Sequence, residues 1–325
     1  MDTVEAKTGY EAGLKEWVDR ERLAVDLNNS VGKLMFEKGV ELVFFRNHLV
    51  DVSISEVLNL FDYAQKVVHK PIDVATTAEV AKTLLDLDLC PSKLDIGKLT
   101  SEYLEAQDDH DSIKGFLSTT LSEHIGEGYA PFEPRDVVLY GFGRIGRLVA
   151  RELIRQAGKG QQLRLRAIVT RSVTEADIIK RAALMRNDSV HGAFNGLVIE
   201  DTKTNTLTIN GQTVHMIAAS NPEDVDYTAY GINDALVIDN TGVFTNREAL
   251  TRHTRSKGVH KVLLTAPGKE IPNVVYGINH RDLDLDNEQI FSAASCTTNA
   301  ISPVLKVIED ELGVVKGHIC LLYTS

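Results

Sequence analysis

Residues 136–150 read DVVLYGFGRIGRLVA, an apolar run followed by three glycines and an amphipathic stretch. The apolar run predicts a buried strand, and the stretch from Arg144 predicts a helix. Between them, G-x-G-x-x-G spacing lets Gly141 form a tight turn, Gly143 admit a pyrophosphate to the backbone, and Gly146 bring helix and strand together. Because the helix would direct its positive end at the phosphates, the segment predicts a dinucleotide-binding loop.

The region that follows alternates short apolar runs with helical stretches. The runs VVLYG, LRLRAIV, ALVID, KVLLTA, NVVYGI and QIFSAA are almost continuously apolar, as in parallel strands buried on both faces. TLTINGQTVHMI differs, because Asn210-Gly211 between alternating strands is a strong type I′ hairpin signal. We therefore expect an α/β fold, a Rossmann-type doubly wound parallel sheet with an antiparallel insertion.

The first part of the chain has a different character. Residues 1–130 hold 24 Asp and Glu against 13 Lys and Arg, whereas the remainder holds 22 of each. Apolar residues recur three and four apart there, which predicts an all-α N-terminal extension that ends at the linker-like GEGYAPFEPRD. We expect a helical extension over 1–130, an NAD(P)-binding Rossmann domain over 131–295, and the beginning of a truncated catalytic domain over 296–325.

Composition excludes several classes of function. The net charge of −11 argues against nucleic-acid binding, and no apolar run approaches the length of a membrane span or signal segment, so a cytoplasmic location is expected. Three widely spaced cysteines favour neither a disulfide framework nor a zinc site, and we expect no metal. His253, His260 and His280 sit among charged residues and are expected at the surface.

The end of the second expected strand bears on cofactor choice. A Rossmann site that prefers NAD places an acidic residue there to hold the ribose 2′-hydroxyl. This chain instead has Thr170-Arg171-Ser172. Arg171 would suit a 2′-phosphate, so the sequence favours NADP or use of both cofactors, while a solvated loop arginine is the alternative.

A candidate nucleophile lies in SAASCTTNA, residues 292–300. The apolar run before Cys296 predicts a strand and the pattern after it predicts a helix, so the thiol should lie at a helix N-terminus, which favours the thiolate. Such a thiolate can attack an aldehyde, and a neighbouring nicotinamide can accept the hydride, leaving a thioester. The alternative is an inert, buried cysteine.

Taken together, these motifs resemble glyceraldehyde-3-phosphate dehydrogenase. GFGRIGRLV, RNDSVHGAFNG, INGQTV, DNTGVF, LLTAPGK, YGIN and SCTTNA occur in the family's order, between about Arg135 and Gly317. The resemblance implies oxidation of glyceraldehyde 3-phosphate with NAD or NADP and inorganic phosphate, giving 1,3-bisphosphoglycerate in glycolysis or gluconeogenesis. It also implies a homotetramer for a complete member of the family.

The resemblance assigns roles to residues of this chain. Cys296 would be the nucleophile, while Ser295 and Thr297 would help bind the substrate and its phosphate. The implied cofactor-binding residues are Gly141, Gly143, Arg144, Ile145, Gly146, Thr241, Gly242 and Thr265, beside Arg171.

The chain also departs from the family pattern. Tyr140 stands where the family commonly has Asn, and Tyr323 falls where the family has the histidine that activates the thiol. A phenol is a poor base near neutral pH. We therefore expect a C-terminally truncated, inactive chain with exposed apolar surface, in which tetramer formation is doubtful. Erythrose-4-phosphate dehydrogenase, or a non-catalytic dinucleotide-binding or regulatory protein, remain as alternatives.

Overall fold

The computed structural model describes residues 2–126, 133–158, 160 and 162–321. The expected boundary between residues 130 and 131 and the position of Tyr323 lie outside these residues. Within the described parts of the chain, no helix is long and apolar enough to cross a bilayer.

Two compact units make up the chain. The first contains residues up to 134 together with 155–162, and the second contains residues 135–154 and 163–325. Each has its own buried apolar cluster, as expected for separately packed cores.

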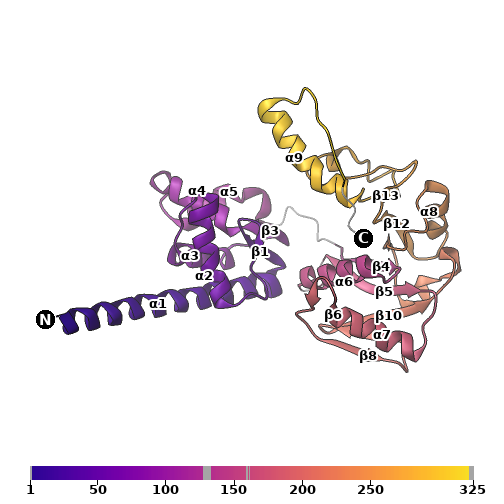
Figure 1. Cartoon of the computed structure of the whole chain (residues 1–325), viewed down its shortest axis with the longest axis horizontal. Coiled ribbons are helices and arrows are strands. Elements are labelled where there is room, and N and C mark those ends of the chain that lie inside the picture. The colour runs from indigo at the N-terminus through magenta and orange to yellow at the C-terminus, as the bar shows by residue number, and fades with distance from the viewer. Residues whose placement is uncertain (1, 127–132, 159, 161, 322–325) are drawn as a thin grey trace. The chain divides into compact units, whose positions relative to one another are not determined.

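The first unit is mainly helical (Figure 1). The C-terminal half of its long first helix buries Ala24, Leu27 and Val31, at the spacing of one helical face. Ser53, Asp73, Asp95 and Ser112 each cap the helix that follows by accepting a hydrogen bond from its first turn. The α-helices of this unit are α1 (Asp2–Lys33), α2 (Ile54–Tyr63), α3 (Val74–Leu85), α4 (Ile96–Glu105) and α5 (Ile113–Thr120).

The expectation of a purely helical extension was wrong in one respect. A three-stranded sheet lies within the first unit, with strand order β2-β1-β3: β1 (Val40–Phe44), β2 (Asn47–His48) and β3 (Ser92–Asp95). VELVF is a short apolar run that periodicity alone cannot assign to strand or helix. Phe45 and Arg46 take positive φ values in the turn to β2, and their backbone N–H groups bond to the Asp95 carboxylate.

The second unit contains the predicted Rossmann-type sheet. Its strand order is β13-β12-β11-β4-β5-β10-β9-β8, and the first six strands are parallel to one another. Numbered along the chain, the parallel strands follow the order 6-5-4-1-2-3, which defines a doubly wound dinucleotide-binding sheet. These strands are β4 (Arg135–Tyr140), β5 (Leu163–Thr170), β10 (Gln212–Ala218), β11 (Ala235–Asp239), β12 (Val259–Leu264) and β13 (Ile290–Ser292).

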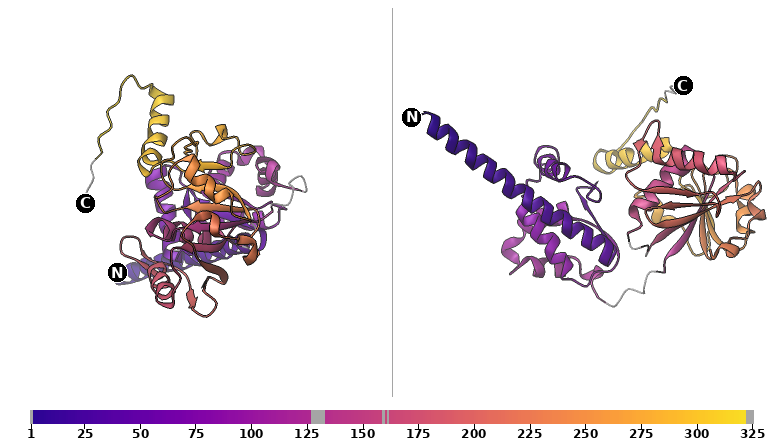
Figure 2. Two further views of the ribbon diagram at one scale, coloured as in Figure 1. Left: turned by 90° about the vertical axis from the view of Figure 1, so that its right-hand side faces the viewer. Right: turned by 90° about the horizontal axis from the view of Figure 1, so that it is seen from below.

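Helices cover both faces of this sheet (Figure 2). Along β4, Val137 and Leu139 pack with α6 and α7, whereas Val138 and Tyr140 pack on the opposite face with Tyr227. All four are buried, which explains the continuous apolar run of this strand. The helices of the unit are α6 (Arg144–Gln156), α7 (Glu175–Arg186), α8 (Arg247–Thr254) and α9 (Cys296–Leu312).

The predicted hairpin forms at Asn210-Gly211. Both residues have positive φ, and Ile209 pairs directly with Gln212, as a two-residue type I′ turn requires. The second strand of the hairpin, β10, then pairs in parallel with β5, so it is also the third strand of the Rossmann order. The antiparallel strands are β8 (Val198–Asp201) and β9 (Thr206–Ile209), and a separate two-stranded pair is formed by β6 (Asn187–Asp188) and β7 (Gly192–Ala193).

Candidate functional site

A cavity of about 340 Å³ opens at the carboxyl ends of β4, β5, β10 and β11. The neighbouring pair β4 and β11 is the topological switch point of the sheet, where such folds bind ligands. The lining residues are Tyr140, Gly141, Phe142, Gly143, Val169, Thr170, Arg171, Arg181, Ala219, Ser220, Thr241, Val243 and Phe244.

The three glycines of the loop meet different constraints. Gly141 has φ +96°, and an added Cβ would lie 3.0 Å from Thr241 Cγ2. A Cβ on Gly146 would lie 2.4 Å from the carbonyl oxygen of Gly141, so only glycine lets α6 start this close to the loop. A Cβ on Gly143 would meet no atom within 4 Å. The open space at Gly143, beside the cavity and the start of α6, fits the pyrophosphate of a dinucleotide.

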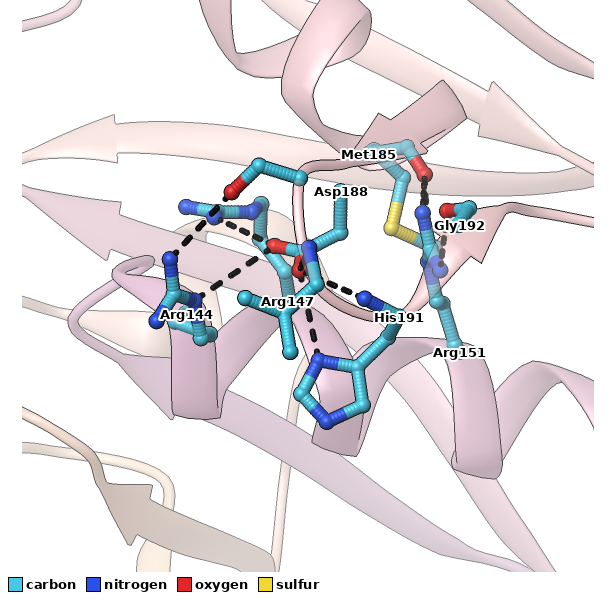
Figure 3. A network of polar contacts seen from close by, with 9 residues as sticks. Arg144, Arg147, Arg151, Met185, Asp188, His191 and Gly192 are labelled. Atoms are coloured by element: carbon cyan, nitrogen blue, oxygen red, sulfur yellow. Dashed lines mark hydrogen bonds and ion pairs between the residues drawn. The ribbon is translucent and has the colours of Figure 1, made fainter. Parts of the chain in front are cut away.

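A buried carboxylate fixes the start of α6 (Figure 3). Asp188, whose side chain is 2% exposed, contacts Arg147 Nη2 at 3.0 Å and Arg144 Nε at 3.8 Å. It also accepts hydrogen bonds from the backbone N–H groups of Val190 and His191. These contacts hold the pKa of Asp188 well below its usual range. The largest cause is the hydrogen bond from the Val190 N–H, and the next is the hydrogen bond from the Arg147 side chain. Arg144 is therefore engaged with Asp188 and does not line the cavity.

A second buried network supports Thr241. Its N–H and hydroxyl donate to Asp239 Oδ1 at 2.8 and 2.7 Å. The other carboxylate oxygen lies 2.9 Å from His253 Nε2, and both of these side chains are fully buried. The expectation that His253 lies at the surface was wrong, because His253 shares the buried face of its helix with Leu250 and its ring packs edge-on to Tyr140. Thr265 also donates to the Asp239 carbonyl oxygen, at 3.0 Å.

Tyr140 forms part of the cavity wall at the end of β4. Its ring is 5% exposed, and its hydroxyl has no hydrogen-bond partner among the described residues. Burial, followed by the charge of Asp239, raises the pKa of Tyr140 to about 12. The phenol therefore stays neutral near physiological pH.

Cys296 is the first residue of α9, as predicted, and its side chain is exposed. Ser295 caps the helix by accepting from Thr298 N–H at 2.9 Å. Asn299 Nδ2 donates to the carbonyl oxygens of Ala293 and Ser295, which fastens the turn from β13 into the helix. This junction follows a parallel strand, so it lies at the same carboxyl edge of the sheet as the cavity.

The structure brings only some of the predicted cofactor residues into the cavity wall. Gly141, Gly143, Arg171 and Thr241 line it. Those that do not are Arg144, Ile145, Gly146, Gly242 and Thr265, and the thiol segment Ser295, Cys296 and Thr297 lies at the separate β13–α9 junction. The individual roles assigned to these residues remain predictions.

Three residues of this region were missed by the sequence analysis. Asn299 follows the cysteine at a spacing that allows its amide to bond back across the turn. Ser220 follows β10, and the hairpin signal alone did not identify this strand as part of the parallel order. Arg181 lies between Ile178 and Ala182 in the buried stripe of α7, and an arginine within an apolar stripe was the available signal.

The strand order, the glycine loop and the cavity at the switch point define a dinucleotide-binding domain of the Rossmann type. Residues 135–247 match the family description "Glyceraldehyde 3-phosphate dehydrogenase, NAD binding domain". The domain formed by these residues belongs to the glyceraldehyde-3-phosphate dehydrogenase family. The sheet and the NAD-binding domain predicted from the sequence are thereby confirmed.

Relatives differ in how much of the chain they match. A "Glyceraldehyde-3-phosphate dehydrogenase-like protein" of Pseudomonas aeruginosa is 42% identical over 296 residues, 89% of this chain and 63% of its own. A glyceraldehyde-3-phosphate dehydrogenase of Zymomonas mobilis is 38% identical over 56% of this chain and 51% of its own. That of Clostridium pasteurianum is 35% identical over 58% and 52%. The chain thus spans between half and two thirds of these relatives, and the first match extends into the helical unit.

Proposed function

We propose that this chain provides the cofactor site and the nucleophile of a phosphorylating glyceraldehyde-3-phosphate dehydrogenase. One observation carries the proposal: an exposed cysteine begins a helix at the same sheet edge as the dinucleotide cavity. In this assignment residues 131–295 bind the cofactor and residues from 296 begin the catalytic part. The matched NAD-binding family supports the cofactor assignment.

The chain's own residues supply the first steps of the reaction. The positive end of α9 favours a Cys296 thiolate, which attacks the aldehyde carbon of glyceraldehyde 3-phosphate and forms a tetrahedral hemithioacetal anion, whose alkoxide oxygen becomes the thioester carbonyl when the hydride leaves. A bound NAD or NADP would accept the hydride from that carbon. The carbon remains attached to sulfur as a thioester. A phosphate oxygen then attacks it, and the departure of the thiolate gives 1,3-bisphosphoglycerate and restores Cys296.

Substrate binding and proton transfer need further groups. Ser295 and Thr297 flank the thiol and offer hydroxyl groups to the substrate phosphate. Cys296 is exposed and no side chain among the described residues is hydrogen-bonded to its sulfur, so a base must still approach the thiol to receive its proton. We place the reaction in the cytoplasm, in glycolysis or gluconeogenesis, with a homotetramer as the working assembly.

The test measures reduced cofactor formed from glyceraldehyde 3-phosphate with and without inorganic phosphate. It should be run on this chain, which we expect to be inactive alone, and on any longer polypeptide that contains it, for which we expect turnover. We expect turnover to require phosphate and to disappear in Cys296→Ser, while Cys320→Ser, which alters another exposed thiol, keeps it. Turnover that persists in Cys296→Ser would refute the nucleophile. Phosphate-independent release of a free acid would instead indicate the erythrose-4-phosphate type of reaction.

A further inference from the structure

The charged residues that line the cavity are all cationic. Of its described lining residues, the charged ones are Arg171 and Arg181, and no carboxylate is among them. An NAD-preferring Rossmann site has an acid at the end of the second strand, where it bonds the ribose 2′-hydroxyl. Here that strand ends at Thr170, whose hydroxyl donates to the Ser172 carbonyl oxygen at 2.9 Å. The cavity wall beside the ribose position is therefore cationic.

Arg181 reaches the cavity from the helix rather than from the loop. It lies on α7, one residue before the buried Ala182, and its side chain is half-buried. Its Nε is buried and has no hydrogen-bond partner within the described part of the chain. A guanidinium nitrogen removed from water without an acceptor is costly, so a small movement of this side chain that gave the guanidinium an anionic acceptor in the cavity would be favourable.

Asp177 carries the negative charge that acts on Arg181, but its carboxylate is hydrogen-bonded to the loop before α7. Asp177, one turn earlier on α7, accepts from Ser172 Oγ at 2.8 Å and from the N–H and hydroxyl of Thr174 at 3.1 and 2.8 Å. Burial lowers the pKa of Arg181, and the charge of Asp177 opposes that shift only in part. Asp177 thus shapes the loop that carries Arg171, and it leaves the Arg181 guanidinium without an ion pair in the described residues.

We propose that Arg171 and Arg181 together bind the 2′-phosphate of NADP, with Arg181 as a specificity-determining residue that acts from α7. This inference rests on the proposed dinucleotide site and assigns it a phosphorylated cofactor. Two guanidinium groups from separate elements suit a phosphomonoester dianion, because each can donate two hydrogen bonds in its own plane. Ser220, at the end of β10, adds a hydroxyl to the same wall.

The test uses two ligands that differ only in the 2′-phosphate, adenosine 2′,5′-bisphosphate and 5′-AMP, with binding measured by titration calorimetry. For the wild-type chain we expect the bisphosphate to bind at least about tenfold more tightly. Arg181→Gln should weaken the bisphosphate by about 10- to 100-fold and leave 5′-AMP within about threefold. Lys180→Gln removes the same charge from the adjacent exposed position, outside the cavity, and should change neither.

The outcomes separate this inference from the proposed function. If 5′-AMP and NAD bind but the bisphosphate has no advantage, the 2′-phosphate assignment is wrong while the dinucleotide site stands. If Arg181→Gln weakens both ligands equally, Arg181 supports the adenosine site or the fold and does not set specificity. If neither nucleotide nor NAD binds the wild-type chain, the cofactor site itself is refuted. Circular dichroism of each variant confirms that the fold is intact.

Discussion

Replacing Asp239 tests whether the buried network beneath the cavity stabilises the second unit. The carboxylate accepts two hydrogen bonds from Thr241 and contacts His253, and the Asp239 and His253 side chains are both 0% exposed. Asp239→Ala removes the acceptor and leaves a buried imidazole without a partner. Breaking such a buried pair costs about 3–5 kcal/mol. For a unit of roughly 150–250 residues, this corresponds to a fall in Tm of about 6–20 °C.

Asp239→Asn is the informative companion. Its amide oxygen can still accept from Thr241, and its amide nitrogen can donate to His253 Nε2 if the imidazole proton moves to Nδ1. His253 Nδ1 is buried and has no partner in the described residues, so a proton moved there would stay unpaired. We therefore expect Asp239→Asn to cost about 1–2 kcal/mol, less than Asp239→Ala. Asp286→Ala, which alters an exposed aspartate, should stay within about 0.5 kcal/mol of wild type.

The assay is urea unfolding followed by near-ultraviolet circular dichroism, which reports on the buried Tyr140 and Tyr227 of the second unit. Tryptophan fluorescence is unsuitable, because the single tryptophan, Trp17, belongs to the first unit. The reasoning fails if Asp239→Ala unfolds within about 1 kcal/mol of wild type, or if Asp239→Asn is as unstable as Asp239→Ala.

Three further predictions concern the loop and its surroundings. Gly146→Ala places a Cβ 2.4 Å from the Gly141 carbonyl oxygen, so calorimetry should show NAD binding at least about tenfold weaker; unchanged binding would contradict the packing argument. Tyr140→Phe removes a buried hydroxyl without a described partner, and thermal unfolding should show stabilisation of about 1 kcal/mol rather than a loss. Hydrogen bonds from Ser172 and Thr174 lower the pKa of Asp177 to about 2, so its contribution is full above about pH 4 and is lost as the pH falls toward 2. Asp177→Asn should flatten stability against pH in that window, and an unchanged slope would assign the acid sensitivity to other groups.

Much of the fold followed from local signals. The buried run before Gly141 and the Asn210-Gly211 turn each specify their geometry within a few residues, and both formed as predicted. The parallel pairing of β10 with β5 could not be predicted in the same way, because each residue pairs with a partner 48 positions earlier in the chain rather than within the hairpin that begins the strand. The strand VELVF was missed because a five-residue apolar run fits a helix or a strand equally well.

The site residues show the same difference between local signals and long-range packing. Arg171 and the loop glycines were identified because their role depends on their position in a strand–loop–helix segment. His253 was misplaced because charged neighbours in the sequence said nothing of the face that packs on Tyr140. Arg181 was missed because its importance depends on a cavity wall completed by residues from other strands. Local chemistry could be read from the sequence, whereas convergence of distant segments required the structure.

The central pairing of the sheet has a consequence for synthesis of the protein. Val137 of β4 pairs with Leu236 of β11, and about 100 residues separate them. At roughly 5–20 residues per second on the ribosome, β4 and its glycine loop emerge about 5–20 s before that partner strand exists. During this interval the apolar strand is exposed and open to wrong pairings or to a chaperone. A nascent chain should therefore begin to bind nucleotide only when β11 has paired with β4 at the centre of the sheet.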